Sequence, residues 1–336
     1  MMIIFWRRLA ILLLLALNGC ASQGPLLPTL LSDLSPDAEL ELDETPFYPQ
    51  KQYQCGPAAL ATVLNYTGIS ITPDELVPLV YLPEKEGSLQ VEMITASRRF
   101  NRIPYAIKPD LETLIAELQA GRPVLVFQNL GLKYLPLWHY AVVIGYSVSQ
   151  DEVVLRSGIT RRKVLSAQRF LNTWERGDRW ALVLLKPGEL PEKPEQMTYL
   201  KAVAAMERVA SPDTLLNAYQ AGLALWPDNP VALFGIASSL HARNDLLAAE
   251  SSYRRLLNRY PGHTAAHNNL AEVLADRGCY ADAVAHIKQA LNIDNGDLEQ
   301  ILLNTHREIL RRERQAETNP VTCQPDHSHH ELNNDL

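Results

Sequence analysis

The sequence predicts an α+β domain over residues 47–190, followed by an all-α repeat domain over residues 196–300. Helical apolar periodicity dominates the first half of the earlier segment, whereas short apolar, β-branched runs dominate its second half, which is typical of an α+β domain. Pro191 and Pro194, with charges between them, mark a linker over residues 191–195. Beyond this linker the apolar and small residues recur at a period of 34, which indicates stacked helical hairpins.

The elements of the first domain follow from local signals. A helix is expected from Cys55 to Gly68, and Thr72 is expected to cap the next helix, with Pro73 in its first turn and Glu75 completing a capping box. The remaining expected elements are helices over 88–99, 110–119 and 166–174, with Ser88 and Asp110 as caps, and strands over 102–108, 123–128, 138–146, 152–156 and 180–185.

The composition is that of a folded protein with no sign of nucleic-acid or metal binding. A chain of 336 residues is longer than one domain usually is, and its hydrophobic content of 47% is ample for a core. The net charge of −7 argues against a nucleic-acid footprint. The four cysteines include no CxxC pair and no close Cys/His set, so no metal and no cofactor is expected. A disulfide between Cys279 and Cys323 is conceivable in an oxidising compartment.

The N-terminal segment has the layout of a signal peptide. Two arginines precede a short apolar run, residues 9–17, which is too short to span a bilayer well. Leu-Asn-Gly-Cys at residues 17–20 resembles the lipobox of bacterial lipoproteins. That resemblance implies a signal peptide over residues 1–19 and a lipid on the sulfur of Cys20. Ala21 follows the cysteine in place of an aspartate, which by the same resemblance implies the outer membrane, facing the periplasm. The alternatives are an ordinary secreted protein and an uncleaved anchor.

Residues 20–46 are expected to form a tether between the lipid and the first domain. They contain four prolines and an acidic cluster, and they show no clear period. The acyl chains on Cys20 would hold the protein at the membrane without a spanning helix.

Cys55 and His139 are the candidate catalytic pair. Cys55 stands where a glutamine-rich segment turns into a helical pattern, and the N–H groups of a helix N-terminus favour a thiolate. His139 begins an apolar strand directly after the irregular loop 129–137. A cysteine on a helix facing a histidine on a sheet is the arrangement of nucleophilic cysteine catalysis. The alternatives are a buried free cysteine and a histidine that is merely a partnered core or surface residue.

Residues 50–60 (Gln-Lys-Gln-Tyr-Gln-Cys-Gly-Pro-Ala-Ala-Leu) and residues 139–146 (His-Tyr-Ala-Val-Val-Ile-Gly-Tyr) resemble the papain-like cysteine peptidase domain that trims double-glycine leaders from bacteriocins. The resemblance covers roughly residues 47–190. It implies a papain-like fold and hydrolysis of a peptide or protein substrate, with Cys55 as nucleophile and His139 as general base.

The same resemblance implies that Gln50 supplies the amide donor of the oxyanion hole, with Gln52 and Gln54 as alternatives. The family usually carries an aspartate on the strand after the histidine strand, and Ser157 stands at that place here. A hydroxyl orients an imidazole but does not stabilise its positive charge as a carboxylate does. Asp151 is nearby but falls on the wrong side of the strand in sequence.

Leader-trimming domains of this kind are commonly fused to an ABC exporter. This sequence shows neither transmembrane helices nor a GxxxxGK[ST] phosphate loop, so no ATP is expected to bind.

Residues 230–263 and 264–297 align at the 34-residue period and resemble tetratricopeptide repeats, with a weaker copy over 196–229. Small residues at positions 237, 249, 271 and 283 let the two helices of each hairpin approach closely. The resemblance implies a short superhelix whose concave face binds a peptide or protein partner. Residues 301–336 are expected to form a terminal helix and a polar tail, and its cluster at 326–330 (Asp-His-Ser-His-His) is expected to be solvated and not a metal site.

Together these patterns predict a membrane-anchored cysteine peptidase with a tetratricopeptide module. The second interpretation is a peptide-binding scaffold with weak catalysis or none, which Arg156-Ser157 in place of an acid favours. A third possibility is acyl transfer to an amine instead of water.

Overall fold

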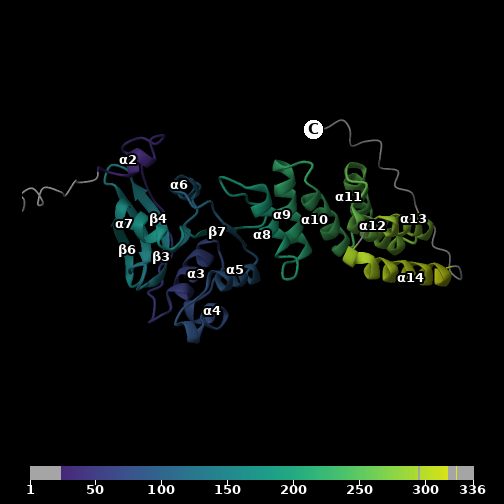
Figure 1. Ribbon diagram of the computed structural model, residues 1–336, viewed down its shortest axis with the longest axis horizontal. Coiled ribbons are helices and arrows are strands. Elements are labelled where there is room, and N and C mark those ends of the chain that lie inside the picture. The colour runs from purple at the N-terminus through teal and green to yellow at the C-terminus, as the bar shows by residue number, and fades with distance from the viewer. Residues whose placement is uncertain (1–23, 294–295, 317–322, 324–336) are drawn as a thin grey trace, which may run out of the picture.

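The structure, a computed structural model, describes residues 24–293, 296–316 and Cys323 (Figure 1). Residues 17–20, which resemble a lipobox, and the histidine-rich cluster at 326–330 lie outside the described residues. In the described part, a domain of sheet and helices is followed by a row of helices, which confirms the predicted order of an α+β domain and an all-α domain. None of the described helices is both long enough and apolar enough to cross a membrane.

The elements of the first domain agree in type with the predicted ones and include several that the sequence did not indicate. They are α2 (Leu27–Leu30), β1 (Glu39–Glu41), α3 (Cys55–Tyr66), α4 (Pro73–Val80), η1 (Pro83–Lys85), α5 (Gln90–Arg99), β2 (Ile103–Ala106), α6 (Leu111–Gln119), β3 (Val124–Asn129), β4 (Trp138–Ser147), β5 (Glu152–Ser157), β6 (Thr160–Ser166), α7 (Ala167–Glu175) and β7 (Ala181–Leu185).

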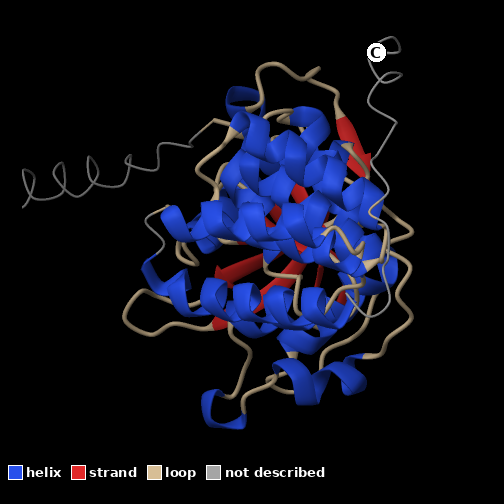
Figure 2. Ribbon diagram, turned by 90° about the vertical axis from the view of Figure 1, so that its right-hand side faces the viewer, coloured by secondary structure: helices blue, strands red, loops and turns tan. Residues whose placement is uncertain are grey.

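The described strands form one antiparallel sheet in the order β2-β7-β3-β4-β5-β6, and β1 pairs with the end of β4. Strand β4 is apolar almost throughout because both faces of the sheet are covered. Tyr140, Val142 and Ile144 belong to the core shared with α3, whereas Ala141 and Val143 belong to the core on the other face. Figure 2 shows the strands behind the helices of the second domain.

Local capping signals placed several helices correctly. Thr72 and Glu75 form the predicted capping box at the start of α4. The carboxylate of Asp110 accepts the Thr113 N–H at the start of α6. Ser88 differs from its expected role, because α5 begins at Gln90 and the Ser88 hydroxyl is buried against the backbone of Gly56.

Strand β6 and the path of the N-terminal segment were not expected. The first residues of β6 are polar and exposed, since it lies at the edge of the sheet, and they lack an apolar alternation. Residues 24–46 pack on the domain and do not form a free tether. Leu27 and Leu31 are 0% and 5% exposed, and the Leu26 and Leu27 N–H groups donate to Asp151 Oδ1. The leucines of this segment supply apolar surface to the core, which fixes it to the sheet.

The segment between the two domains is also held in place. The Tyr105 hydroxyl accepts the Glu195 N–H at 3.0 Å. The carboxylate of Glu117, which is fully buried, accepts the Glu192 N–H and is paired with Arg122. Tyr199, Leu200 and Val203, in the first helix after this segment, belong to the core of the sheet domain. The predicted linker over 191–195 is therefore packed against the first domain.

The second domain is a row of helical hairpins. Its elements are α8 (Gln196–Ala204), α9 (Pro212–Leu225), α10 (Pro230–Ala242), α11 (Leu246–Arg259), α12 (Thr264–Asp276), α13 (Tyr280–Asn292), η2 (Gly296–Leu298) and α14 (Glu299–Ala316). The hairpin of α10 and α11 recurs after 34 residues as that of α12 and α13, since α10 begins at Pro230 and α12 at Thr264. The small residues expected at the contacts, Ala237, Ala249, Ala271 and Ala283, are all fully buried. The helical architecture agrees with the predicted superhelix.

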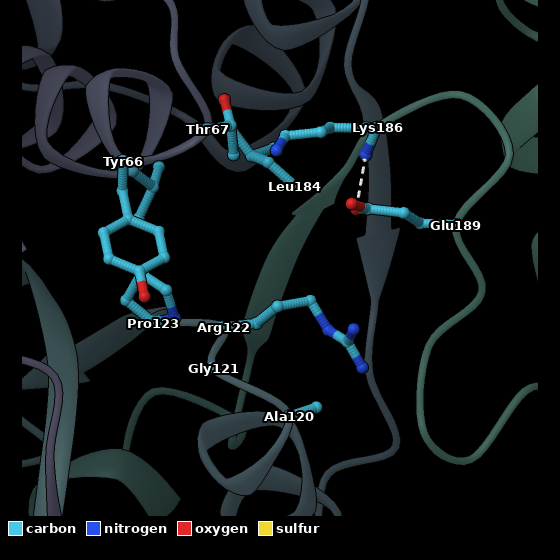
Figure 3. Close-up of a pocket in the computed structure, with 10 residues that line it drawn as sticks. Tyr66, Thr67, Ala120, Gly121, Arg122, Pro123, Leu184, Lys186 and Glu189 are labelled. Atoms are coloured by element: carbon cyan, nitrogen blue, oxygen red, sulfur yellow. Dashed lines mark hydrogen bonds between the residues drawn. The ribbon is translucent and has the colours of Figure 1, made fainter.

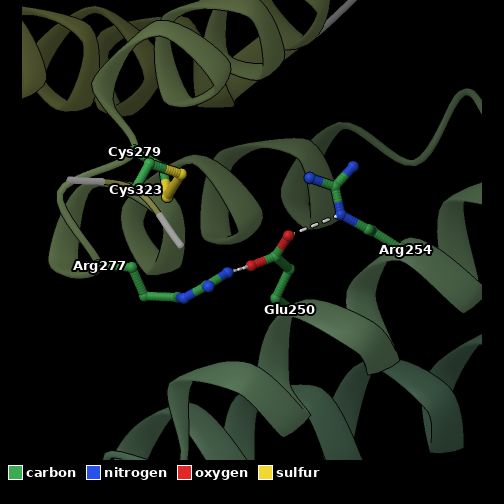
Figure 4. Close-up of a disulfide and its surroundings, with 5 residues drawn as sticks. All are labelled: Glu250, Arg254, Arg277, Cys279 and Cys323. Atoms are coloured by element: carbon green, nitrogen blue, oxygen red, sulfur yellow. Dashed lines mark hydrogen bonds and ion pairs between the residues drawn. A yellow bond between two sulfur atoms is a disulfide. The ribbon is translucent and has the colours of Figure 1, made fainter. Parts of the chain in front are cut away.

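The disulfide left open by the sequence is present between Cys279 and Cys323. It joins the turn before α13 to the chain beyond α14 (Figure 4). Close to it, the Glu250 carboxylate pairs with Arg254 and Arg277, which links α11 to the end of α12.

Candidate active site

The candidate active site lies where the start of α3 meets β4 and β5. One small cavity is lined there by Phe47, Tyr48, Gln50, Cys55, Ala58, Ala59, Thr62, Tyr140, Arg156, Ser157 and Gly158. Three of the four predicted site residues, Cys55, Gln50 and Ser157, therefore line the same cavity. The fourth, His139, does not line it: its ring bonds Ser157, and no hydrogen bond among the described residues joins it to Cys55.

Cys55 is the first residue of α3 and, among the described cysteines, the one with a free thiol. Tyr53, with φ +60°, turns the chain into the helix. Burial raises the pKa of the Cys55 thiol, although hydrogen bonds from the backbone N–H groups of Tyr140 and Gly56 lower it. The expected thiolate is therefore not the resting form at neutral pH. The helix N-terminus does supply a donor, but desolvation is the larger effect.

His139 begins the buried part of β4. Its Nε2 lies 2.9 Å from Ser157 Oγ, and the two residues are 7% and 5% exposed. Burial, with a smaller contribution from the positive charge of Lys163, lowers the pKa of His139 to about 4. The imidazole is therefore neutral at pH 7, and its described partner is a hydroxyl and not a carboxylate.

Gln50 is the glutamine that lies in the cavity with Cys55. Its N–H donates to Gly158 O at 3.1 Å, and its side-chain Oε1 is buried without a partner among the described residues. The alternatives fit less well, because Gln52 is exposed and Gln54 is the N-cap residue of α3 outside this cavity. Asp151 is also excluded as the third member of the site, since its carboxylate binds backbone N–H groups at residues 26 and 27.

Arg156 and Tyr140 belong to the site and were not predicted. Arg156 lines the cavity and is 5% exposed, and its guanidinium donates to three backbone carbonyls. The signal in the sequence was an arginine inside an otherwise apolar strand, Val153-Val154-Leu155-Arg156, because charged residues are seldom fully buried without a partner. Tyr140 contributes its backbone N–H to the thiol.

A second cavity, of about 190 Å³, adjoins the first at Gln50. It is lined by Tyr48, Pro49, Gln50, Lys51, Gln54, Ala58, Pro73 and Asp74, and three of these residues also line the first cavity. An exposed ion pair between Lys51 and Asp74, at 2.7 Å, lies at its margin. A substrate that passes Cys55 thus has space on the side of Gln50.

The loop between β3 and β4 is apolar and exposed beside His139. Its exposed apolar residues are Leu130, Leu132, Tyr134, Leu135 and Leu137, and Trp138, the first residue of β4, is exposed beside them. The loop is ordered by Asn129, whose side-chain oxygen accepts the N–H groups of Gly131 and Leu137 at 2.9 Å each. A fixed apolar surface next to a candidate catalytic residue is typical of a binding site.

A third cavity lies at the other end of α3 from Cys55, and Figure 3 shows its lining. Its volume is about 140 Å³, and Tyr66, Thr67, Arg122 and Lys186 are among the residues around it. Arg122 is paired with Glu117 and Glu192. This cavity contains no nucleophile next to a base, so it is not the candidate for catalysis.

Comparisons with known proteins agree with the fold of the first domain. Residues 42–181 match the model of the Peptidase_C39 like family. This match confirms the papain-like class predicted for the domain and indicates a cysteine peptidase domain. A search of the curated proteins finds no match.

Among solved structures, a C39-like peptidase from Bacillus anthracis is 19% identical, with a TM-score of 0.38, over 45% of this chain and 98% of that one. The peptidase domain of ComA, a bi-functional ABC transporter from Streptococcus, is 21% identical, with a TM-score of 0.36, over 43% and 99% of the two chains. A double-glycine-motif protease from an AMS/PCAT transporter is 16% identical, with a TM-score of 0.31, over 43% and 91%.

Proposed function

We propose that the protein is a membrane-anchored cysteine peptidase that hydrolyses peptide bonds at Cys55, and that its helical repeats bind a protein or peptide segment. The observation that best supports the peptidase is the shared cavity, in which Cys55 lies with Gln50 and Ser157 while Ser157 binds His139. The match of residues 42–181 to a peptidase family supports the same reaction.

In the proposed reaction His139 moves protons and Cys55 forms the covalent bond. The proposal requires the tautomer in which Ser157 Oγ accepts the Nε2–H and the ring takes the thiol proton at Nδ1. The sulfur attacks the peptide carbonyl, and the resulting oxyanion accepts hydrogen bonds from the Gln50 amide and a backbone N–H at the start of α3. His139 then protonates the leaving amine, and a thioester with Cys55 remains. Water, deprotonated by His139, cleaves the thioester and restores the thiol.

The electrostatics of the pair make this first proton transfer difficult in the unliganded protein. The thiol pKa is raised and the imidazole pKa is lowered, so the thiolate–imidazolium pair is less stable than the two neutral groups. The proton therefore moves as the carbonyl is attacked and not beforehand. A slow peptidase is the expected result.

The alternative function is a peptide-binding scaffold with weak catalysis or none. Two observations favour it, namely a serine at the place of the family's aspartate and the positive charge of Lys163, which further disfavours imidazolium. In this alternative the apolar loop beside His139 and the cavity beside Gln50 bind a peptide that is released uncut.

The proposed location is the cell envelope, with the lipid on Cys20 as the anchor. The support comes from the lipobox-like residues 17–20, and the disulfide between Cys279 and Cys323 fits an oxidising compartment. The 34-residue recurrence of the helical hairpins supports the tetratricopeptide assignment, and with it a protein or peptide partner.

Alkylation of Cys55 by a thiol-directed electrophile across pH distinguishes the two functions, with wild type compared to His139→Ala and turnover of a peptide library measured in parallel. A peptidase is expected to show a rate that falls in His139→Ala and turnover that disappears in Cys55→Ala. The same thiol profile in both proteins, at or above the ordinary value of about 8.5 and without turnover, supports the scaffold, since burial alone raises the pKa of Cys55.

A further inference from the structure

Three consecutive residues at the end of β5 each hold a different part of the candidate site. Arg156 binds the backbone of the segment 43–45, Ser157 binds His139, and the carbonyl of Gly158 accepts the Gln50 N–H. We propose that Arg156 is a positioning residue that acts through Gln50. It holds Gln50 where the amide donates to the oxyanion, and it does not itself contact the substrate. This inference rests on the proposed function.

The contacts of Arg156 join two segments that are far apart in sequence. Its Nε donates to Thr45 O at 3.0 Å, and its Nη2 donates to Asp43 O at 2.9 Å. Its Nη1 donates to Arg161 O at 2.8 Å, on β6. Each nitrogen of the guanidinium therefore donates to a backbone carbonyl, and these bonds fix the segment 43–45 to the β5–β6 hairpin.

This attachment decides where Gln50 lies. The chain between Thr45 and Gln50 contains Phe47 and Tyr48, both of which line the cavity with Cys55. The segment is fixed at one end by Arg156 and at the other by the bond from Gln50 to Gly158. An oxyanion donor must be aimed to within a few tenths of an ångström before the reaction begins. Loss of the first attachment is expected to leave Gln50 in place only part of the time.

The charge of Arg156 is costly where it lies, which argues for a specific role. The residue is 5% exposed, and burial together with the positive charge of Arg161 lowers its pKa. The three acceptors are neutral carbonyls, and a planar guanidinium reaches all three at once, whereas a lysine ammonium on a flexible stem does not. A buried charge is therefore kept at this position, where it holds the loop that carries Gln50.

The test compares Arg156→Gln and Arg156→Lys with wild type in peptide hydrolysis, each also combined with Gln50→Ala. Arg162→Gln is the matched control, because Arg162 lies on the same hairpin but is exposed and pairs with Glu41. We expect kcat to fall about 10- to 100-fold in both Arg156 variants, with little change in KM, since a misplaced donor acts in the transition state. In the Gln50→Ala background the same changes are expected to cost less than about threefold, because the donor is already lost. The rate of Cys55 alkylation should stay within about twofold of wild type, since that reaction forms no oxyanion.

A kcat within about twofold of wild type in folded Arg156→Gln, or an equal loss in both backgrounds, would overturn the inference. Failure of the proposed function looks different, because wild type would then show no turnover or Cys55→Ala would retain it. In that case amide hydrogen exchange over residues 43–50 tests whether Arg156 holds this segment in place. Faster exchange in Arg156→Gln than in Arg162→Gln supports it, and equal exchange refutes it. The lysine variant keeps the charge and serves if the glutamine variant does not fold.

Discussion

His139 Nε2 and Ser157 Oγ lie 2.9 Å apart, and this contact defines what the candidate site is able to do. The contact fixes the ring, and in the tautomer in which the serine oxygen accepts the Nε2–H, Nδ1 is left as a base. The hydroxyl does not offset the positive charge that the ring acquires when it takes a proton. Ser157 therefore orients the ring without the electrostatic support that a carboxylate gives, and two of the predictions below follow from this difference.

Ser157→Asp is expected to increase catalysis. A carboxylate at this place stabilises imidazolium and raises the pKa of His139 from about 4, so the thiol proton moves to the ring more readily. At pH 7 we expect the alkylation rate of Cys55 and kcat/KM to rise by about tenfold or more, which corresponds to about 1.4 kcal/mol. Ser157→Asn is the matched control, because an amide also orients the ring but adds no charge. An equal gain in both variants would show that orientation, and not charge, was missing.

Lys163→Met is expected to raise the pKa of His139 by less than Ser157→Asp does. Lys163 lowers this pKa through its positive charge, but burial is the larger cause and stays in the variant. The measurement is an NMR titration of the His139 ring between pH 3 and 8. Lys186→Met, which removes a lysine at the cavity on the far end of α3, should leave the titration unchanged. A titration curve of Lys163→Met that coincides with wild type would contradict the assignment.

Much of this site was predictable because its signals are local. The start of α3 at Cys55 and the start of β4 at Trp138 follow from a change of pattern within a few residues. The contact of Ser157 with His139 is also within reach of the sequence, because the position of Ser157 depends on counting along one strand. The hydrogen bonds of Arg156 to residues 43 and 45 were not predictable, since they join segments more than 100 residues apart. For the same reason the sequence predicts a tether over residues 20–46, although leucines of its described part, 24–46, enter the core.

The resting state of Cys55 shows a second limit of sequence reasoning. A helix N-terminus predicts a lowered thiol pKa, and the donors that lower it are indeed present. The opposing effect, burial under β4 and the segment that carries Gln50, depends on how the whole domain closes over the thiol. The sequence shows the helix terminus but not the amount of water excluded from it.

Acidification is expected to destabilise the protein in a window set by His139. The folded-state pKa is about 4 and the ordinary value is 6.5, so between these pH values the unfolded chain binds a proton that the folded chain does not. Stability from the neutral ring is therefore fully present above pH 6.5 and is lost as the pH falls to about 4. The loss is expected to reach about 3 kcal/mol for this group.

Urea denaturation at pH 7 and pH 4.5 measures this effect. His139→Gln should lose less stability between the two pH values than wild type does. His286 titrates in the same window, since burial and His267 lower its pKa to about 4, so His286→Gln serves as the comparison in the second domain. An identical pH dependence in wild type and His139→Gln would refute the assignment to His139.

Arg122→Met is expected to destabilise the protein by about 3 kcal/mol, because it leaves a buried carboxylate without its cation. Glu117 is fully buried and pairs with Arg122, and its other oxygen accepts the Glu192 N–H in the segment between the two domains. Burial raises the pKa of Glu117 while Arg122 lowers it, so removal of Arg122 should let Glu117 take up a proton and reduce the loss of stability at acidic pH.

Two further variants serve as controls for Arg122→Met. Adding Glu117→Gln to the variant removes the unpaired charge and is expected to recover most of the stability. Lys193→Met, which breaks an exposed ion pair with Glu112 on the same surface, should cost less than about 1 kcal/mol. Equal losses in Arg122→Met and Lys193→Met would mean that the Glu117 pair contributes no more than a surface contact, and that packing alone holds the segment in place.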